Sequence, residues 1–202
     1  MSEESTRPVD DPREQRHIDG GALRALAHPL RVQIFDILSQ RGPQTASSLA
    51  ALTGESSGAT SYHLRALAKH DLIREVAGRG SGRERWWERP RGSVSFGSAD
   101  GMKTPAGRAA TEFVMTEFFN RRHQQLMRYL VGGIRNPDGS DDDHGFITTA
   151  TAWLTPEQMG ELTARLSAIV DEFVENYRDQ QGDAVRAVTI RADVFPIPDE
   201  ER

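Results

Sequence analysis

The chain has 202 residues, of which 37% are hydrophobic and 27% charged, and its formal net charge at pH 7 is −5. This composition is typical of a soluble globular protein with one mid-sized domain or two small ones. No apolar run reaches the roughly 20 residues that cross a bilayer, and the polar N-terminus lacks a secretory signal, so we expect a cytoplasmic protein that is not in the membrane. The absence of cysteine excludes disulfide scaffolds, thiolate nucleophiles and cysteine-bound metals.

The net charge conceals a division of the chain into a basic and an acidic part. Residues 20–91 contain eleven Lys and Arg against six Asp and Glu, whereas residues 92–202 contain eleven against eighteen. A basic segment favours contact with a polyanion, and the acidic segment must have a different role.

The first part of the chain changes from a polar tail to a helical pattern. Residues 1–17 carry mixed charges and almost no apolar side chains, and we expect a disordered tail. Apolar residues at spacings of three and four, from Leu23 to Leu38, then predict a helix that ends at Gly42 and Pro43. Because Pro29 falls inside this pattern, the helix is either kinked there or begins near it.

Two shorter helices and a hairpin are expected next. Thr45 caps the first of these helices and Gly54 follows its last turn, while the second begins after Ser56 or Ser57 and runs to about residue 70. Strands at 73–76 and 85–88 flank the glycine-rich turn 78–82. The order of three helices and a basic hairpin is that of a winged helix-turn-helix domain, which we place at residues 18–91.

The small and polar side chains at the start of the third helix point to DNA. The N-terminal half of such a helix approaches base edges in the major groove, and small residues permit that approach. The arginine-rich hairpin suits a wing that lies along the backbone or in the minor groove. For His63, contact with a phosphate and packing against the first helix are equally good interpretations. The candidate DNA-binding residues are Ser56, Ser57, Gly58, Ser61, Tyr62, His63, Arg65, Arg79, Arg83 and Arg85.

The same stretch resembles the winged-helix domain of ArsR-type transcriptional regulators, in an actinobacterial-looking branch. The resemblance rests on LAHPLR at residues 26–31, SYHLRAL at 61–67 and RERWW at 83–87, and it covers about residues 18–90. It implies base contacts from Ser57, Gly58, Ser61 and Tyr62, and wing contacts from Arg79 and Arg83.

The chain departs from the metal sensors of that family. The helix before the recognition helix lacks their cysteine pair, Thr60 stands at a usually apolar position, and the acidic C-terminal part is additional. Thiolate metal sensing is therefore excluded.

The rest of the chain predicts a second domain of α+β type. Residues 92–103 are rich in glycine and serine and form the connector, with a short strand around Val94. Thr104 and a following proline open a long helix to about Gly132. A strand at 146–153, a helix capped by Thr155 and a strand at 187–194 would complete residues 104–202 as a dimerisation and effector domain. The expected fold class is α+β, mainly α.

The long helix carries apolar side chains around most of its circumference. A helix of this kind must be covered from two directions, by its own domain and by a partner copy, although a fully buried helix of a monomer is the alternative. We therefore predict a homodimer, and leave open a small-molecule effector site lined by Phe118, Phe119 and Trp153. The candidate dimer-interface residues are Phe113, Val114, Phe118, Phe119, Leu126 and Leu130.

The sequence favours a dimeric, sequence-specific regulator, a repressor, bound to a double-stranded DNA operator. A helix-turn-helix module that docks a protein, and a ligand-processing domain fused to a DNA-binding domain, are the alternatives. No nucleophile elbow, phosphate loop or HExxH motif is present, so we expect no enzyme and no cofactor. We expect no metal either, although His123 and the acidic run that ends at His144 leave the question open.

Overall fold

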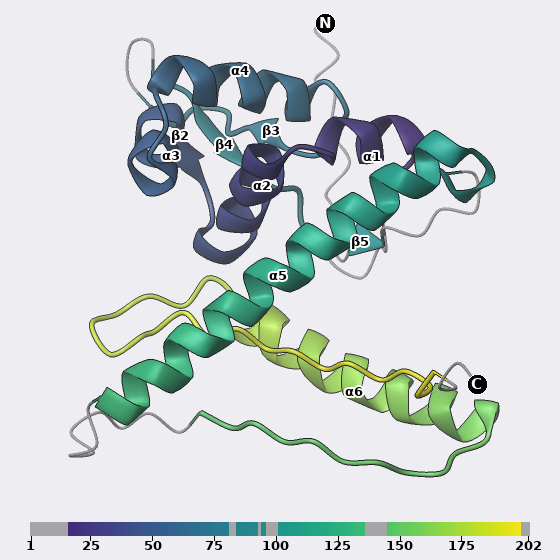
Figure 1. Cartoon of the computed structure of the whole chain (residues 1–202). Coiled ribbons are helices and arrows are strands. Elements are labelled where there is room, and N and C mark those ends of the chain that lie inside the picture. The colour runs from purple at the N-terminus through teal and green to yellow at the C-terminus, as the bar shows by residue number, and fades with distance from the viewer. Residues whose placement is uncertain (1–15, 81–83, 93, 96–100, 136–144, 199–202) are drawn as a thin grey trace, which may run out of the picture. The chain divides into compact units, whose positions relative to one another are not determined.

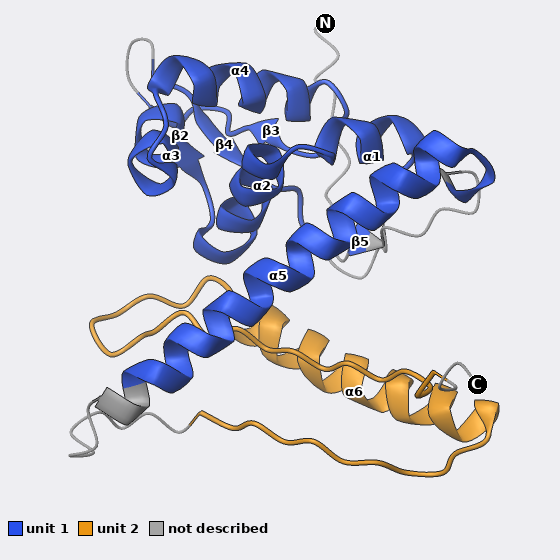
Figure 2. Cartoon of the chain, in the orientation of Figure 1, with its two compact units in different colours: residues 1–137 blue, residues 138–202 orange. Residues whose placement is uncertain are grey.

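The computed structural model describes residues 16–80, 84–92, 94–95, 101–135 and 145–198 (Figure 1). The chain divides into two compact units, residues 1–137 and residues 138–202 (Figure 2). Among the described residues, no helix combines the length and the apolar character that crossing a membrane requires.

The first predicted helix is two helices in the structure. Helix α1 spans Gly20–Leu26 and α2 spans Pro29–Arg41. Asp19 caps α1 by accepting a hydrogen bond from the Ala22 N–H at 2.7 Å, and His28 Nδ1 caps α2 by accepting one from the Leu30 N–H at 3.2 Å. Proline suits the first position of a helix because it has no N–H to satisfy there. Of the two sequence-based alternatives, the helix beginning at Pro29 is therefore confirmed.

The two shorter helices lie where the capping residues predict them. Helix α3 spans Ala46–Thr53 and α4 spans Ser57–Ala68. Thr45 forms a capping box with Ser48, and Gly54 ends α3 in a left-handed conformation with φ of 77°. Of the two candidate caps of α4, Ser56 is the one used, and its hydroxyl oxygen accepts from the Ala59 N–H at 3.1 Å.

A small antiparallel sheet completes the winged helix. Strands β2 (Gln44–Thr45), β3 (Arg74–Glu75) and β4 (Trp86–Glu88) are ordered β2-β4-β3. A separate parallel pair joins β1 (Arg16–His17) to β5 (Val94–Ser95). The expected strand near Val94 is confirmed, whereas the disordered tail is wrong for Arg16 and His17, because strand β5 offers their backbone a partner. Residues 1–15 lie outside the described part.

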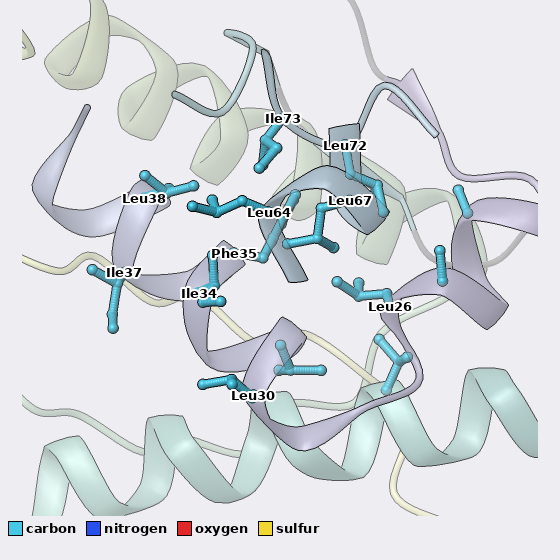
Figure 3. Packing of buried hydrophobic residues seen from close by; sticks show 14 of the residues in the cluster. Leu26, Leu30, Ile34, Phe35, Ile37, Leu38, Leu64, Leu67, Leu72 and Ile73 are labelled. Atoms are coloured by element: carbon cyan, nitrogen blue, oxygen red, sulfur yellow. The ribbon is translucent and has the colours of Figure 1, made fainter. Parts of the chain in front are cut away.

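The core of the first unit lies between α2 and α4 (Figure 3). Leu64 and Leu67 on α4 are fully buried in one cluster with Ile34 on α2. Trp87, on β4, is 8% exposed and belongs to the same cluster, so it anchors the wing to the helices. The opposite side of α4 is thereby left for solvent or a ligand.

The long helix α5 (Pro105–Arg135) packs against α1 and α2 within the first unit. Ala110, Val114 and Phe118 form its buried stripe at spacings of four, and the Phe118 ring meets the Phe35 ring edge-on at 6.1 Å. Arg121 adds an ion pair to Asp36 at 3.2 Å. The compact unit therefore extends to residue 137, well past the boundary that we expected at 92–103, because α5 supplies part of the core.

In the described part of the second unit, residues 145–198, one helix is the regular element. Helix α6 spans Pro156–Tyr177, with the predicted capping box formed by Thr155 and Gln158. The predicted strands at 146–153 and 187–194 are wrong, since neither segment has strand structure among residues 145–198. A β-prone run becomes a strand only where a neighbouring backbone pairs with it. The α+β class, mainly α, nevertheless holds for the chain, with its small sheets in the first unit.

Candidate nucleic-acid interface

The solvent-facing side of α4 carries a continuous stripe of candidate DNA contacts. Gly58, Tyr62, Arg65 and Lys69 follow one another at spacings of four, three and four, and all four are exposed. Tyr62 is the most prominent, with 65% of its surface exposed. Residues at these spacings share one face of a helix, which here is the face opposite Leu64.

The start of α4 is both narrow and firmly held. Ser57 and Gly58 are exposed and small, so a large partner can approach the backbone there. Ser56 uses its hydroxyl oxygen as the cap of α4. Thr60, which is fully buried, donates its hydroxyl to the Ser56 carbonyl at 2.9 Å. Thr60 therefore fills its usually apolar position without leaving its polar group unsatisfied, while Ser61 lies half-buried at the border of the stripe.

His63 faces α2 rather than the exposed stripe. Its ring lies 4.5 Å from the ring of His28, and its Nδ1 is buried with no hydrogen-bond partner in the part of the chain that the structure describes. Desolvation lowers the pKa of His63, with His28 and Arg31 acting in the same direction and Glu55 against them. Of the two interpretations of His63, the geometry thus favours packing against α2, which is the second part of the predicted first helix, over direct contact with a phosphate.

Two described arginines of the wing differ in their contacts: one stacks on a tryptophan ring and the other forms an ion pair. The Arg79 guanidinium lies 3.8 Å from the centre of the Trp86 ring. Stacking uses the face of the guanidinium and leaves its N–H edge for an acceptor such as a phosphate. Arg85, in contrast, is paired with Glu75 at 3.3 Å on the surface. Arg83 lies outside the described residues.

Gly80 shapes the turn of the wing. Its φ is +106°, and a Cβ there would lie 2.5 Å from the Glu84 carbonyl oxygen. Only glycine fits this conformation and this close approach without strain. Gly80 therefore allows the backbone at residue 80 to lie close to the Glu84 carbonyl, just before β4.

The six candidate dimer-interface residues differ in how deeply the chain buries them. Val114 is fully buried and Phe118 is 8% exposed within the chain's own core, so their assignment to an interface with another copy is corrected. Phe113, Phe119 and Leu130 remain 38%, 47% and 38% exposed. Leu126 is half-buried.

Two cations at this surface, one within the stripe and one beside it, are not among the contacts predicted from the sequence. Lys69 lies four residues after Arg65, and that spacing could have identified it. Arg31 stands in the LAHPLR motif, but its relation to α4 depends on tertiary packing. No other described residue forms a hydrogen bond or ion pair with its Nε, which is buried.

The residues suggested for an effector site belong to different units, and those suggested for a metal are not grouped among the described residues. Phe118 lies in the core of the first unit, whereas Trp153, in the second unit, is 98% exposed. In the described ranges, no three His, Asp or Glu side chains are grouped as metal ligands. His123 is exposed, and the acidic run that ends at residue 144 lies outside those ranges.

Comparison with known proteins finds a helix-turn-helix domain within the first unit. Residues 26–76 match the helix-turn-helix domain family. A crystal structure of a possible transcriptional regulator for arsenical resistance is 26% identical, with a TM-score of 0.31, and the match covers 54% of this chain and 94% of that one. No curated protein matches the chain.

Two further similar structures come from mycobacteria. One is the homodimeric winged helix-turn-helix DNA-binding domain of a possible ArsR-family regulator from Mycobacterium bovis, 18% identical, with a TM-score of 0.30 and coverage of 62% of this chain and 84% of that one. The other is RV1404 from Mycobacterium tuberculosis, 18% identical, with a TM-score of 0.29 and coverage of 74% and 80%.

The family match spans α2, α3 and α4 and ends at the first strand of the wing. It lies within the longer segment, about residues 18–90, in which the sequence resembles ArsR-type regulators and in which the helices and wing take the expected order. Over residues 26–76 the chain therefore contains a helix-turn-helix domain, and the strands that follow give it the fold of a winged helix-turn-helix.

Proposed function

We propose that the protein is a sequence-specific transcriptional regulator, a repressor, that binds a double-stranded operator as a homodimer in the cytoplasm. Helix α4 enters the major groove, with Ser57, Gly58, Ser61 and Tyr62 nearest the bases. Arg65 and the wing arginines contact the backbone or the minor groove.

The exposed stripe of α4 is the observation that carries this proposal. One side of the helix is anchored by Leu64 and Leu67, while the other combines a small N-terminal half with Arg65 and Lys69. Neither cation has an ion-pair partner among the described residues, whereas Arg74 is paired with Glu88 at 2.8 Å. Unpaired cations on a rigid helix are available to neutralise phosphates.

The homodimer is supported by exposed apolar side chains on α5. Phe113, Phe119, Met127, Tyr129 and Leu130 are each between 38% and 47% exposed. Exposed apolar surface of this kind marks interaction sites, and a symmetric operator is read by two recognition helices about one turn of DNA apart.

A salt titration of DNA binding tests the proposal. The affinity for a fragment selected from genomic DNA should fall steeply with salt and should exceed the affinity for random DNA of equal length by about a thousandfold or more. Equal affinities for the two duplexes would refute the regulator and favour a module that docks a protein.

Substitutions then separate base contacts from backbone contacts. Ser61→Ala and Tyr62→Ala should reduce the preference for the selected fragment, by about 1–3 kcal/mol for a lost base contact. Arg83→Ala and Arg79→Ala should weaken binding to all sequences alike. The reverse pattern would show that the wing, and not α4, recognises the sequence.

A further inference from the structure

Arg31, at the first turn of α2, is a cation placed beside the recognition helix. Its Nε is buried and has no hydrogen-bond partner among the described residues. An unsatisfied buried donor costs free energy comparable to that of a lost hydrogen bond, and more when the group is charged. An oxyanion bound to the terminal nitrogens of the guanidinium would offset part of this cost by pairing with its charge.

The surroundings of Arg31 are basic or neutral rather than acidic. His28 caps the same helix, and the His63 ring on α4 lies 4.5 Å from the His28 ring. Desolvation lowers the pKa of the Arg31 guanidinium, against a smaller opposite effect of Tyr62. Glu55 is the acidic group that acts on His63. No carboxylate among the described residues is within ion-pair distance of Arg31, so none of them neutralises its charge.

Tyr62 connects this position to the proposed interface. It belongs to the exposed stripe of α4, its ring lies 5.2 Å from that of His63, and it is close enough to Arg31 to act on its charge. Arg31 therefore lies at the border of the surface that faces DNA, on a helix other than the one that enters the groove.

We propose that Arg31 binds a backbone phosphate of the operator, next to the bases that α4 contacts, and so fixes the angle at which α4 enters the groove. The inference rests on the proposed function and adds a positioning contact from α2. A guanidinium offers several N–H donors in one plane, so it can hold two oxygens of one phosphate. The His28 and His63 rings would support its side chain from the protein side.

Salt dependence tests the proposal directly. Arg31→Gln should weaken binding to the selected fragment and to random duplex by a similar factor, about tenfold, and should reduce the slope of log affinity against log salt by about 1. Arg31→Lys, which keeps the charge, should retain the slope while losing part of the affinity. Arg41→Gln removes one charge from the far end of the same helix and should leave the slope unchanged.

A set of duplexes, each with one neutral methylphosphonate linkage, locates the phosphate. One linkage should weaken binding of the wild type but not of Arg31→Gln, which is the coupling that a direct contact produces. Equal slopes for Arg31→Gln and wild type, or no linkage coupled to residue 31, would overturn the inference. The proposed function would survive that result if the wild type still preferred the selected fragment. Thermal melting of each variant shows whether it is folded, and for an unfolded Arg31→Gln the linkage test is made with Arg31→Met, which removes the charge and keeps the aliphatic part of the side chain.

Discussion

Two adjacent phenylalanines on α5 should respond in opposite ways to the same substitution. Phe118 is 8% exposed and packs edge-on against Phe35, whereas Phe119 is 47% exposed. Phe118→Ala should destabilise the fold, and Phe119→Ala should leave the fold nearly unchanged while weakening association between copies. The pair is matched in chemistry and in position along the helix, so the difference isolates burial.

The expected cost of Phe118→Ala follows from its contacts. Burial of a phenylalanine side chain contributes about 1.5–3 kcal/mol. The edge-on contact with Phe35 adds about 1 kcal/mol. With the cavity left behind, the loss should be about 4 kcal/mol, within the usual range for such truncations. Phe119→Ala should change the free energy of unfolding by less than about 1 kcal/mol.

Urea denaturation followed by far-ultraviolet circular dichroism, at one fixed protein concentration, measures these changes. With a urea dependence of about 2 kcal/mol per molar, Phe118→Ala should lower the midpoint by about 2 M. Light scattering at several concentrations measures association. If Phe119→Ala lowered the midpoint as much as Phe118→Ala, the packing of α5 on α1 and α2 would be refuted. An unchanged mass for Phe119→Ala at all concentrations would remove Phe119 from the dimer interface.

Three further substitutions test local features. Because the fold lowers the pKa of His63, the unfolded state binds its proton more readily, so stability should fall as the pH drops below about 6.5. His63→Gln should lose this part of the acid sensitivity, measured as urea midpoints from pH 7.5 to 5, whereas the exposed His70→Gln should keep it. Gly80→Ala should weaken DNA binding, because the added Cβ would clash with the Glu84 carbonyl and distort the wing. DNA binding equal to that of the wild type would contradict this effect of the clash on the wing. Thr155→Ala removes the α6 cap and should destabilise that helix by about 1 kcal/mol, seen as reduced helical dichroism on warming.

The helix boundaries of the first unit could be predicted from the sequence because local chemistry determines them. Thr45, Gly54 and Ser56 act within one helical turn, and each does in the structure what its residue type indicates. The split between α1 and α2 was only half predictable. Pro29 suits a kink and a helix start equally, and the choice depends on the His28 side chain capping the Leu30 N–H.

Features that depend on distant partners could not be predicted. The apolar side chains around α5 predicted that two different surfaces cover this helix, but they did not show which residues face each surface. Val114 and Phe118 were therefore assigned to the dimer interface, whereas they lie in the chain's own core. The threonine-rich segment 146–153 has strand propensity without a paired neighbour in the structure. Arg31 could not be identified as a candidate contact, because only the fold brings the start of α2 beside Tyr62.

Thr45 serves two elements at once, and this has a consequence for the variation that the position can accept. Its backbone pairs with Trp86 in the sheet, its hydroxyl oxygen accepts from the Ser48 N–H at 3.1 Å to cap α3, and the residue is 5% exposed. A strand favours a β-branched side chain, a cap needs an oxygen, and a buried site rejects a charge. Threonine meets all three requirements, and serine meets two. In a library of random variants selected for folding, this position should therefore retain almost only these two residues, although it lies outside α4 and outside the turn of the wing.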